Sequence, residues 1–256
     1  MTAWLPDVPW YVLVTIPLVI VAAYTVFGAT GFGSSIIAVP VLAHWLPLTF
    51  AVPLVTALDS VSTLNASYRQ WRHADWREYR RLLPPILIGI AAGTTLLVNL
   101  PRGVALMALG IFVTAYGTYL LVGQHQWRPL RPAWAWPLGF VGGMFSVNFG
   151  TGGPVYMVYI ASRIHDKTAL RATSSVLVTT SVLIRTGVFI VTGLLLNAPL
   201  LLCAAALLPL MFVGYVLGNR LHYALTRAGV MKMIAGLLTL NGAVLITRAL
   251  AALRGE

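Results

Sequence analysis

The chain has 256 residues, of which 59% are hydrophobic and only 9% are charged, and its mean hydropathy is +0.85. Soluble domains carry about 25% charged residues, so this composition excludes an ordinary soluble protein and indicates an integral membrane protein. The formal net charge is +11, but the arginines lie between apolar runs, where they meet lipid headgroups. We therefore expect a bilayer with anionic headgroups as a partner, and no nucleic acid.

Ten apolar segments follow one another along the chain and predict an all-α membrane protein with one domain, residues 1–256. They cover residues 10–27, 31–46, 48–68, 82–99, 103–122, 134–146, 150–162, 168–193, 197–219 and 229–250. A helix needs about 20 residues to span a bilayer. The segments at 31–46, 134–146 and 150–162 are shorter, so each either spans a thinned region or forms half of a re-entrant hairpin.

Basic residues predict which loops face the cytoplasm. Thirteen of the seventeen lysines and arginines follow the third, fifth, seventh and ninth segments. They are Arg69, Arg72, Arg77, Arg80, Arg81, Arg128, Arg131, Arg163, Lys167, Arg171, Arg220, Arg227 and Lys232. By the positive-inside rule these four loops are cytoplasmic, which places both termini on the extracytoplasmic side.

The two halves of the chain, about 10–122 and 134–250, show weak self-similarity. A shift of 119 residues aligns Gly31, Gly33 and Ser34 with Gly150, Gly152 and Gly153, and a shift of 125 aligns Pro84, Gly89 and Gly93 with Pro209, Gly214 and Gly218. Each half holds five segments, an odd number, so the second half enters the membrane inverted. Inverted repeats are common in secondary transporters, whose substrate site lies near the midplane between the halves.

Glycine-rich stretches at 28–35 and 146–154 occupy matched positions in the two halves and predict helix breaks. Glycine lets backbone N–H groups point into one concavity, and a helix that restarts after a break presents the positive end of its dipole. Such a helix start is a ready anion site. The candidate substrate-binding residues are Gly31, Gly33, Ser34, Ser35, Asn148, Gly150, Thr151, Gly152 and Gly153. The alternative is that these small residues only allow close helix packing.

Asp59 and Arg185 are ionisable residues inside apolar segments. A bare charge at that depth is costly, so both should face the protein interior or a wet cavity. One interpretation is a structural ion pair. The other gives Arg185 a role in binding an anion and Asp59 a role in proton coupling, and both can hold in one transport cycle.

Neither metal nor cofactor chemistry is expected. The single cysteine, Cys203, lies in an apolar run, and the five histidines show no metal-ligand spacing. The sequence contains no P-loop either, so it does not indicate that ATP powers transport. We expect a protein without catalytic residues that is not an enzyme.

Two stretches, "GATGFGSSIIAVPVL" (28–42) and "GFVGGMFSVNFGTGGPVYMVYI" (139–160), resemble the glycine-rich motifs of the sulfite exporter TauE/SafE family of membrane permeases. Segment number and spacing fit over essentially the whole chain. The resemblance implies a bacterial-type inner-membrane transporter of sulfite, sulfonates or related organosulfur anions, coupled to protons. Under this resemblance, the residues that correspond to the family's motifs are Gly31, Gly33, Ser34, Gly150, Gly152 and Gly153. Tyr159 stands where Pro40 of the first motif predicts a proline, which leaves the path of segment 150–162 open.

These observations together predict a multi-pass secondary transporter that exports a small sulfur-containing anion, with protons as the coupling ion. Transport of another organic anion and a non-transport membrane scaffold are the alternatives. The sequence leaves the substrate, the direction, the stoichiometry and the oligomeric state open, a homodimer included.

Overall fold

The computed structural model describes residues 10–30, 34–68, 71–99, 101–122, 129–221 and 227–254, and the regular structure in these ranges is helical. Its helices are α1 (Trp10–Thr30), α2 (Ser34–Leu42), α3 (Leu48–Tyr68), α4 (Trp76–Asn99), α5 (Arg102–Val122), α6 (Ala135–Phe149), α7 (Gly152–Arg163), α8 (Lys167–Val191), α9 (Ala198–Leu221) and α10 (Arg227–Arg254), with short 3-10 turns η1 (Trp71–His73) and η2 (Pro132–Trp134). An all-helical protein whose helices follow the ten predicted segments is therefore confirmed.

One boundary differs clearly from the prediction. Helix α4 begins at Trp76, whereas the apolar pattern predicts a start at residue 82. The carboxylate of Asp75 accepts the backbone N–H groups of Arg77 (3.0 Å) and Glu78 (3.2 Å), which satisfies two donors that the first turn of a helix leaves free. This first turn is charged, so a search for apolar runs does not include it.

Three helices are too short to cross a bilayer alone. α2 has 9 residues, α7 has 12 and α6 has 15. At about 1.5 Å per residue, even α6 falls short of the hydrocarbon thickness of about 30 Å. α2 packs against α1 and α7 packs against α6, so each half contains a broken helix pair. By contrast, Thr168–Val191 and Ala198–Arg220 each combine the length and the hydropathy of a membrane span.

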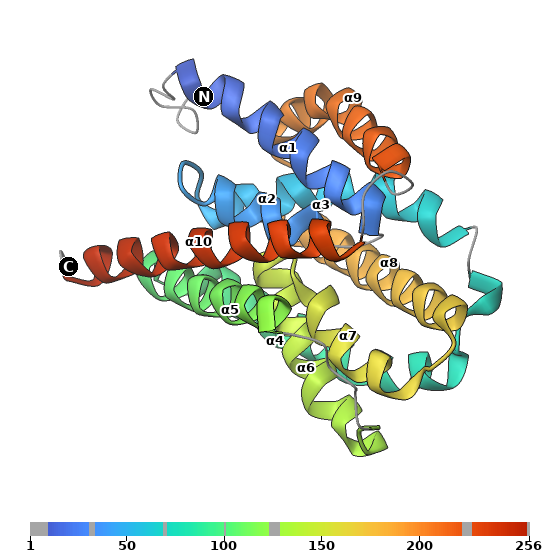
Figure 1. Ribbon diagram of the computed structural model, residues 1–256. Helices are drawn as coiled ribbons and strands as arrows, with labels where there is room; N and C mark the ends of the chain where they lie inside the picture. The colour runs from blue at the N-terminus through green and yellow to red at the C-terminus, as the bar shows by residue number, and fades with distance from the viewer. Residues whose placement is uncertain are drawn as a thin grey trace.

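The two halves of the chain meet mainly through four helix pairs. α1 lies against α9, α3 against α8, α4 against α6, and α5 against α10. Figure 1 shows α1 beside α9 at one edge and α10 crossing over α5. The described start of α1 and the end of α10 lie on the same side of the molecule (Figure 1).

Large apolar side chains are widely exposed on the outer helix surfaces, while some ionisable residues are buried. Val191, Leu202 and Leu240 are 88%, 71% and 67% exposed, whereas Asp59 and Arg185 are buried. A monomeric soluble protein rarely exposes apolar surface so widely, because contact with water is unfavourable. An apolar solvent around the helices removes that cost, so this distribution agrees with a membrane protein.

Glycine allows the closest approach between α4 and α6. A Cβ atom added at Gly143 would lie 2.3 Å from the carbonyl oxygen of Ile86, and one added at Gly89 would lie 2.1 Å from that of Phe140. Because both obstacles are backbone atoms, the helices would have to separate to admit any side chain. Gly89 and Gly143 therefore serve close helix packing.

We expect Gly143→Ala to destabilise the fold by about 1–3 kcal/mol, because an extra methyl group in a tight contact forces the backbone to shift. The thermal unfolding temperature of the purified protein in detergent measures this loss. Gly187→Ala in α8 is the matched control, because a Cβ there meets nothing within 4 Å. An unfolding temperature unchanged by Gly143→Ala would contradict this account of the α4–α6 contact.

Candidate functional site

The two helix breaks meet at one cavity. It lies between the starts of α2 and α7 and the facing sides of α3 and α8, and its volume is about 30 Å³. Its lining residues are Phe27, Ser34, Ser35, Ile36, Asp59, Thr63, Gly150, Thr151, Gly153, Pro154, Val178 and Val182, six from each half. A cavity of this size holds about two water molecules.

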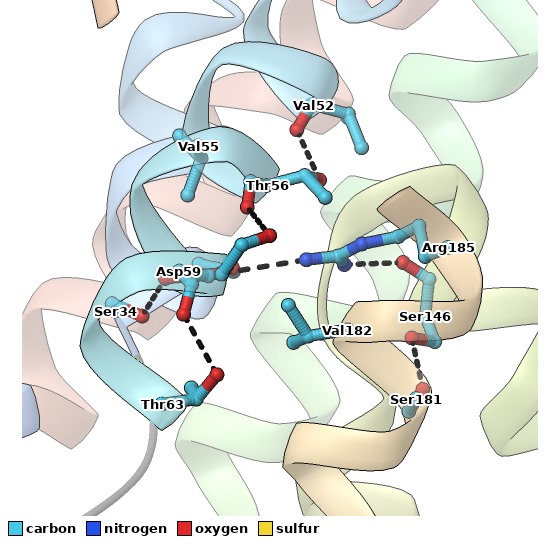
Figure 2. Close-up of polar contacts among 12 residues, drawn as sticks. Ser34, Val52, Val55, Thr56, Asp59, Thr63, Ser146, Ser181, Val182 and Arg185 are labelled. Carbon is cyan, nitrogen blue, oxygen red and sulfur yellow. Dashed lines mark hydrogen bonds and ion pairs between the residues drawn. The ribbon is translucent and has the colours of Figure 1, made fainter. Parts of the chain in front are cut away.

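Asp59 is the acidic centre of the cavity and is 3% exposed. One carboxylate oxygen accepts the hydroxyl groups of Tyr24 and Ser34, both at 2.7 Å. The other accepts the hydroxyl of Ser35 at 2.5 Å and the Nη2 donor of Arg185 at 3.4 Å. Figure 2 shows Asp59 on α3 with Ser34 on one side and Arg185 on the other. The carboxylate therefore has four donors from three other helices.

Arg185 faces Asp59 from α8 and is 1% exposed. Its Nη1 donor reaches the backbone carbonyl of Ser146 at 2.6 Å, at the end of α6 (Figure 2). Gly150 adopts φ +71°, and a Cβ there would lie 3.0 Å from Nη1 of Arg185 and 2.7 Å from Cβ of Ser35. Glycine at this position thus satisfies both the left-handed turn that ends α6 and the space that the guanidinium needs.

Two buried side-chain atoms in the described ranges have no hydrogen-bond partner, and both belong to this region. They are Oγ1 of Thr151, which is 1% exposed and lines the cavity, and Nε of Arg185. An unsatisfied buried polar group costs about 1–3 kcal/mol, so such atoms are rare and mark places where a partner can bind. These two groups therefore lack hydrogen-bond partners, although both oxygens of Asp59 already accept hydrogen bonds.

The starts of α2 and α7 supply further donors. Ser34 is the first residue of α2, and Gly152 is the first residue of α7 after Thr151 at its N-cap. The side chain of Thr151 makes no capping hydrogen bond. The first N–H groups of a helix lack partners within the helix, and the helix dipole makes this end positive.

The predicted site residues divide into three groups. Those that line the cavity are Ser34, Ser35, Asp59, Gly150, Thr151 and Gly153, with Arg185 bonded to Asp59. Gly152 instead packs against α6, where an added Cβ would lie 2.6 Å from the carbonyl oxygen of Gly142. The side chain of Asn148 also does not line the cavity. Gly31 and Gly33 lie outside the described residues.

Asn148 belongs to α6, so the second break is narrower than the predicted stretch at 146–154. Its amide donates to the carbonyl oxygens of Gly93 (3.0 Å) and Met144 (2.9 Å), which binds α6 to α4. The helix continues to Phe149, and the break is confined to Gly150 and Thr151. The first stretch is narrower too, because Gly28 and Thr30 are still part of α1.

Tyr24 and Tyr156 are site residues that the sequence patterns did not indicate. The hydroxyl of Tyr24 bonds to Asp59, and that of Tyr156 lies 3.3 Å from Oγ of Ser181. Ser181 in turn lies 2.6 Å from Oγ of Ser146 (Figure 2). Each tyrosine contributes one polar atom from an otherwise apolar helix face, so hydropathy alone does not reveal it.

A second polar cluster joins α4 to the far end of α7. Glu78 is 4% exposed, and its Oε1 accepts the guanidinium groups of Arg81 (2.7 Å) and Arg163 (2.9 Å). Its Oε2 accepts the hydroxyl of Tyr159 at 2.8 Å. The tyrosine that departs from the expected proline is thus a partner of Glu78, and α7 runs without a break to Arg163.

Arg185→Met should destabilise the protein by about 3–5 kcal/mol, because it leaves the buried Asp59 carboxylate without its cation. Adding Asp59→Asn should recover much of that loss, because the double variant has no unpaired charge. Thermal unfolding of the two single variants and the double variant measures the coupling between the residues. Strictly additive effects would show that the two side chains do not act as a pair.

Tyr159→Phe should cost about 1.5–3 kcal/mol, because the lost hydrogen bond goes to a charged carboxylate. Tyr79→Phe is a matched control, because Tyr79 Oη lies 3.0 Å from Oγ1 of Thr180 and loses only a neutral hydrogen bond. The unfolding temperatures of the two variants give the comparison. Equal losses would argue against a stabilising role for the Glu78 cluster.

Comparison with known proteins agrees with the architecture. The model of the family "Sulfite exporter TauE/SafE" matches residues 16–245. The "Probable inner membrane transporter protein TsaS" of Comamonas testosteroni is 28% identical over 190 residues, which cover 74% of this chain and 80% of that protein. No solved structure matches the chain. Because the family match covers nearly the whole chain, this protein belongs to the sulfite exporter TauE/SafE family, whose members are membrane transporters and not enzymes.

Proposed function

We propose that this protein is a secondary transporter that binds a small sulfur-containing anion, such as sulfite or a sulfonate, between its two broken helices. The observation that carries the proposal is the cavity at which the starts of α2 and α7 meet beside Arg185. Proton exchange at Asp59 would couple transport to the proton gradient. The family name and the relative's name support an exporter in an inner membrane.

The donors around the cavity favour an anion over a cation. Two helix starts, the hydroxyl of Thr151 and the guanidinium of Arg185 all present hydrogen-bond donors or positive charge. A metal cation would need several carboxylate or imidazole ligands. Among the described residues that line the cavity, Asp59 is the one acidic side chain, and it already accepts four donors.

The helix pairing supports an inverted repeat. If α1 to α5 correspond to α6 to α10, exchange of the halves converts the α1–α9 pair into the α6–α4 pair. The same exchange converts the α3–α8 and α5–α10 pairs into themselves. All four pairs are the main contacts between the halves. A two-fold relation between the halves explains this pattern directly.

Individual contacts follow the same correspondence. A Cβ added at Gly89 would strike the carbonyl of Phe140, and one added at Gly214 would strike the carbonyl of Val21. Gly214 follows Gly89 by 125 residues, and Phe140 follows Val21 by 119, the two shifts that align the halves in sequence. Equivalent glycines therefore make equivalent close approaches in both halves.

The cavity is built from corresponding positions as well. A shift of 119 residues relates Ser34 to Gly153, Asp59 to Val178, and Thr63 to Val182, and all six line the cavity. This relation supports a site on the axis between the halves, where inverted-repeat transporters hold their substrates near the midplane. The total of ten segments is even and therefore places both termini on one side, for which the loop charges favour the extracytoplasmic face.

Vesicles that contain the purified protein should conduct sulfite down an imposed gradient, and Gly153→Ala should reduce that flux. Gly153 lines the cavity, and its Cβ would meet only Val178 at 3.5 Å, so the variant should fold while its methyl group narrows the site. Gly152→Ala is less informative, because its methyl group would strike backbone of α6. Isotope flux and thermal unfolding of the same preparations give the two readouts.

Gly187→Ala is the control for this experiment, because it adds a methyl group to α8 where nothing lies within 4 Å. Its flux should equal that of the unmodified protein. If neither sulfite nor a sulfonate crosses the membrane, the proposed transport function fails. If Gly153→Ala loses stability together with flux, the packing interpretation of this glycine and the scaffold alternative gain support.

A further inference from the structure

We propose that the Asp59 carboxylate is an internal counter-ion that occupies the donors of the substrate site, so that the site takes up one monoanion together with one proton and transport is electroneutral. This inference rests on the proposed function and specifies the charge of its substrate. It also specifies the ratio of the two transported species.

The charge balance of the site is the first step. The buried charged side chains among the described residues are Asp59, Glu78 and Arg185. Glu78 is paired with Arg81 and Arg163 in its own cluster, so the cavity has one negative and one positive group. The site without substrate is therefore electrically neutral.

The geometry of Asp59 is the second step. Its two oxygens hold the hydroxyls of Ser34 and Ser35, at the start of α2, and one donor of Arg185. Two oxygens of a sulfonate or bisulfite would accept hydrogen bonds from these same groups. The cavity of about 30 Å³ has no room for such an anion beside the carboxylate in its present position. Substrate must therefore compete with Asp59 for the same donors.

Proton uptake resolves this competition. A monoanion beside the ionised carboxylate would leave one uncompensated negative charge in a buried site, which is strongly unfavourable. Protonation of Asp59 restores neutrality, weakens its hold on Arg185, and frees the donors of α2. Thr151 Oγ1 and Arg185 Nε, which have no partner, are then available to the bound anion as well.

Among the described residues, no other group near Asp59 provides this exchange. The titratable side chains facing it are Tyr24 of α1 and Arg185 of α8, while α2 contributes hydroxyl groups. Tyr156 of α7 interacts electrostatically with Arg185. On α9, which also packs against α3, Tyr215 lies against Phe27, with ring centroids 5.9 Å apart. A tyrosine hydroxyl does not ordinarily ionise near neutral pH, and arginine does not lose its proton, so Asp59 is the proton carrier.

The charge balance also determines the kind of coupling. The empty site and the site with both proton and monoanion are neutral, whereas a site with one of the two carries a net charge. Only the neutral forms reorient readily in an apolar medium, so proton and anion travel in the same direction. Export then requires an internal excess of the anion large enough to exceed the opposing proton gradient.

The test uses methanesulfonate, a permanent monoanion, in vesicles that contain the full chain. We expect one proton per methanesulfonate, measured with a trapped pH indicator and isotope uptake, and no current. An interior more alkaline by one pH unit should give about tenfold accumulation, because one pH unit is a tenfold ratio of protons. A membrane potential set with potassium and valinomycin should not change that value.

Asp59→Asn should still exchange internal for external methanesulfonate but lose net uptake and proton movement, because its amide cannot release a proton. Asp59→Glu keeps a titratable group and should retain proton movement. If Asp59→Asn does not fold, the current and the proton ratio of the unmodified protein still decide the question.

Current during uptake, accumulation that follows the membrane potential, or proton movement that persists in Asp59→Asn would overturn the inference and leave the proposed function intact. Absence of both methanesulfonate and sulfite flux in the unmodified protein would instead overturn the proposed function, and this inference with it.

Discussion

The need to neutralise charge in an apolar interior is the constraint on which this structure depends. Asp59 and Arg185 lie on different helices from different halves, and each is at most 3% exposed. Neither is stable at that depth alone, so the pair requires α3 and α8 to lie together. Serine hydroxyls of α2 and a carbonyl of α6 complete the hydrogen bonding, which brings both helix breaks to the same point.

The sequence predicted the helices well because hydropathy is a strong signal in membrane proteins, and it predicted the cavity through the glycine breaks. It failed where hydrogen bonding, not hydropathy, determines the structure. The start of α4 depends on capping by Asp75, and the amide of Asn148 bonds to Gly93 outside the cavity. The roles of Tyr24 and Glu78 depend on contacts between distant segments, which a single sequence does not reveal.

The two halves of the chain contribute different chemistry to the site. Gly89 lies close to the backbone carbonyl of Phe140, and Gly214 lies close to that of Val21, so both halves contribute a glycine to a tight helix contact. The ionisable groups differ between the halves, because a shift of 119 residues in the sequence places Val178 at the position of Asp59 and Ala66 at that of Arg185. Each half thus contributes one charge, and the neutral pair exists only where the two halves meet.

The carbonyl of Ser146 has a consequence beyond the site itself. It accepts the backbone N–H of Gly150 at 2.9 Å, which helps to end α6, and also the guanidinium of Arg185 at 2.6 Å. One oxygen atom therefore fastens the hinge of the broken helix to the cation of α8. A guanidinium that moved away from Ser146 would remove one of the two hydrogen bonds to this oxygen, so the position of the α8 cation and the end of α6 are linked through one atom.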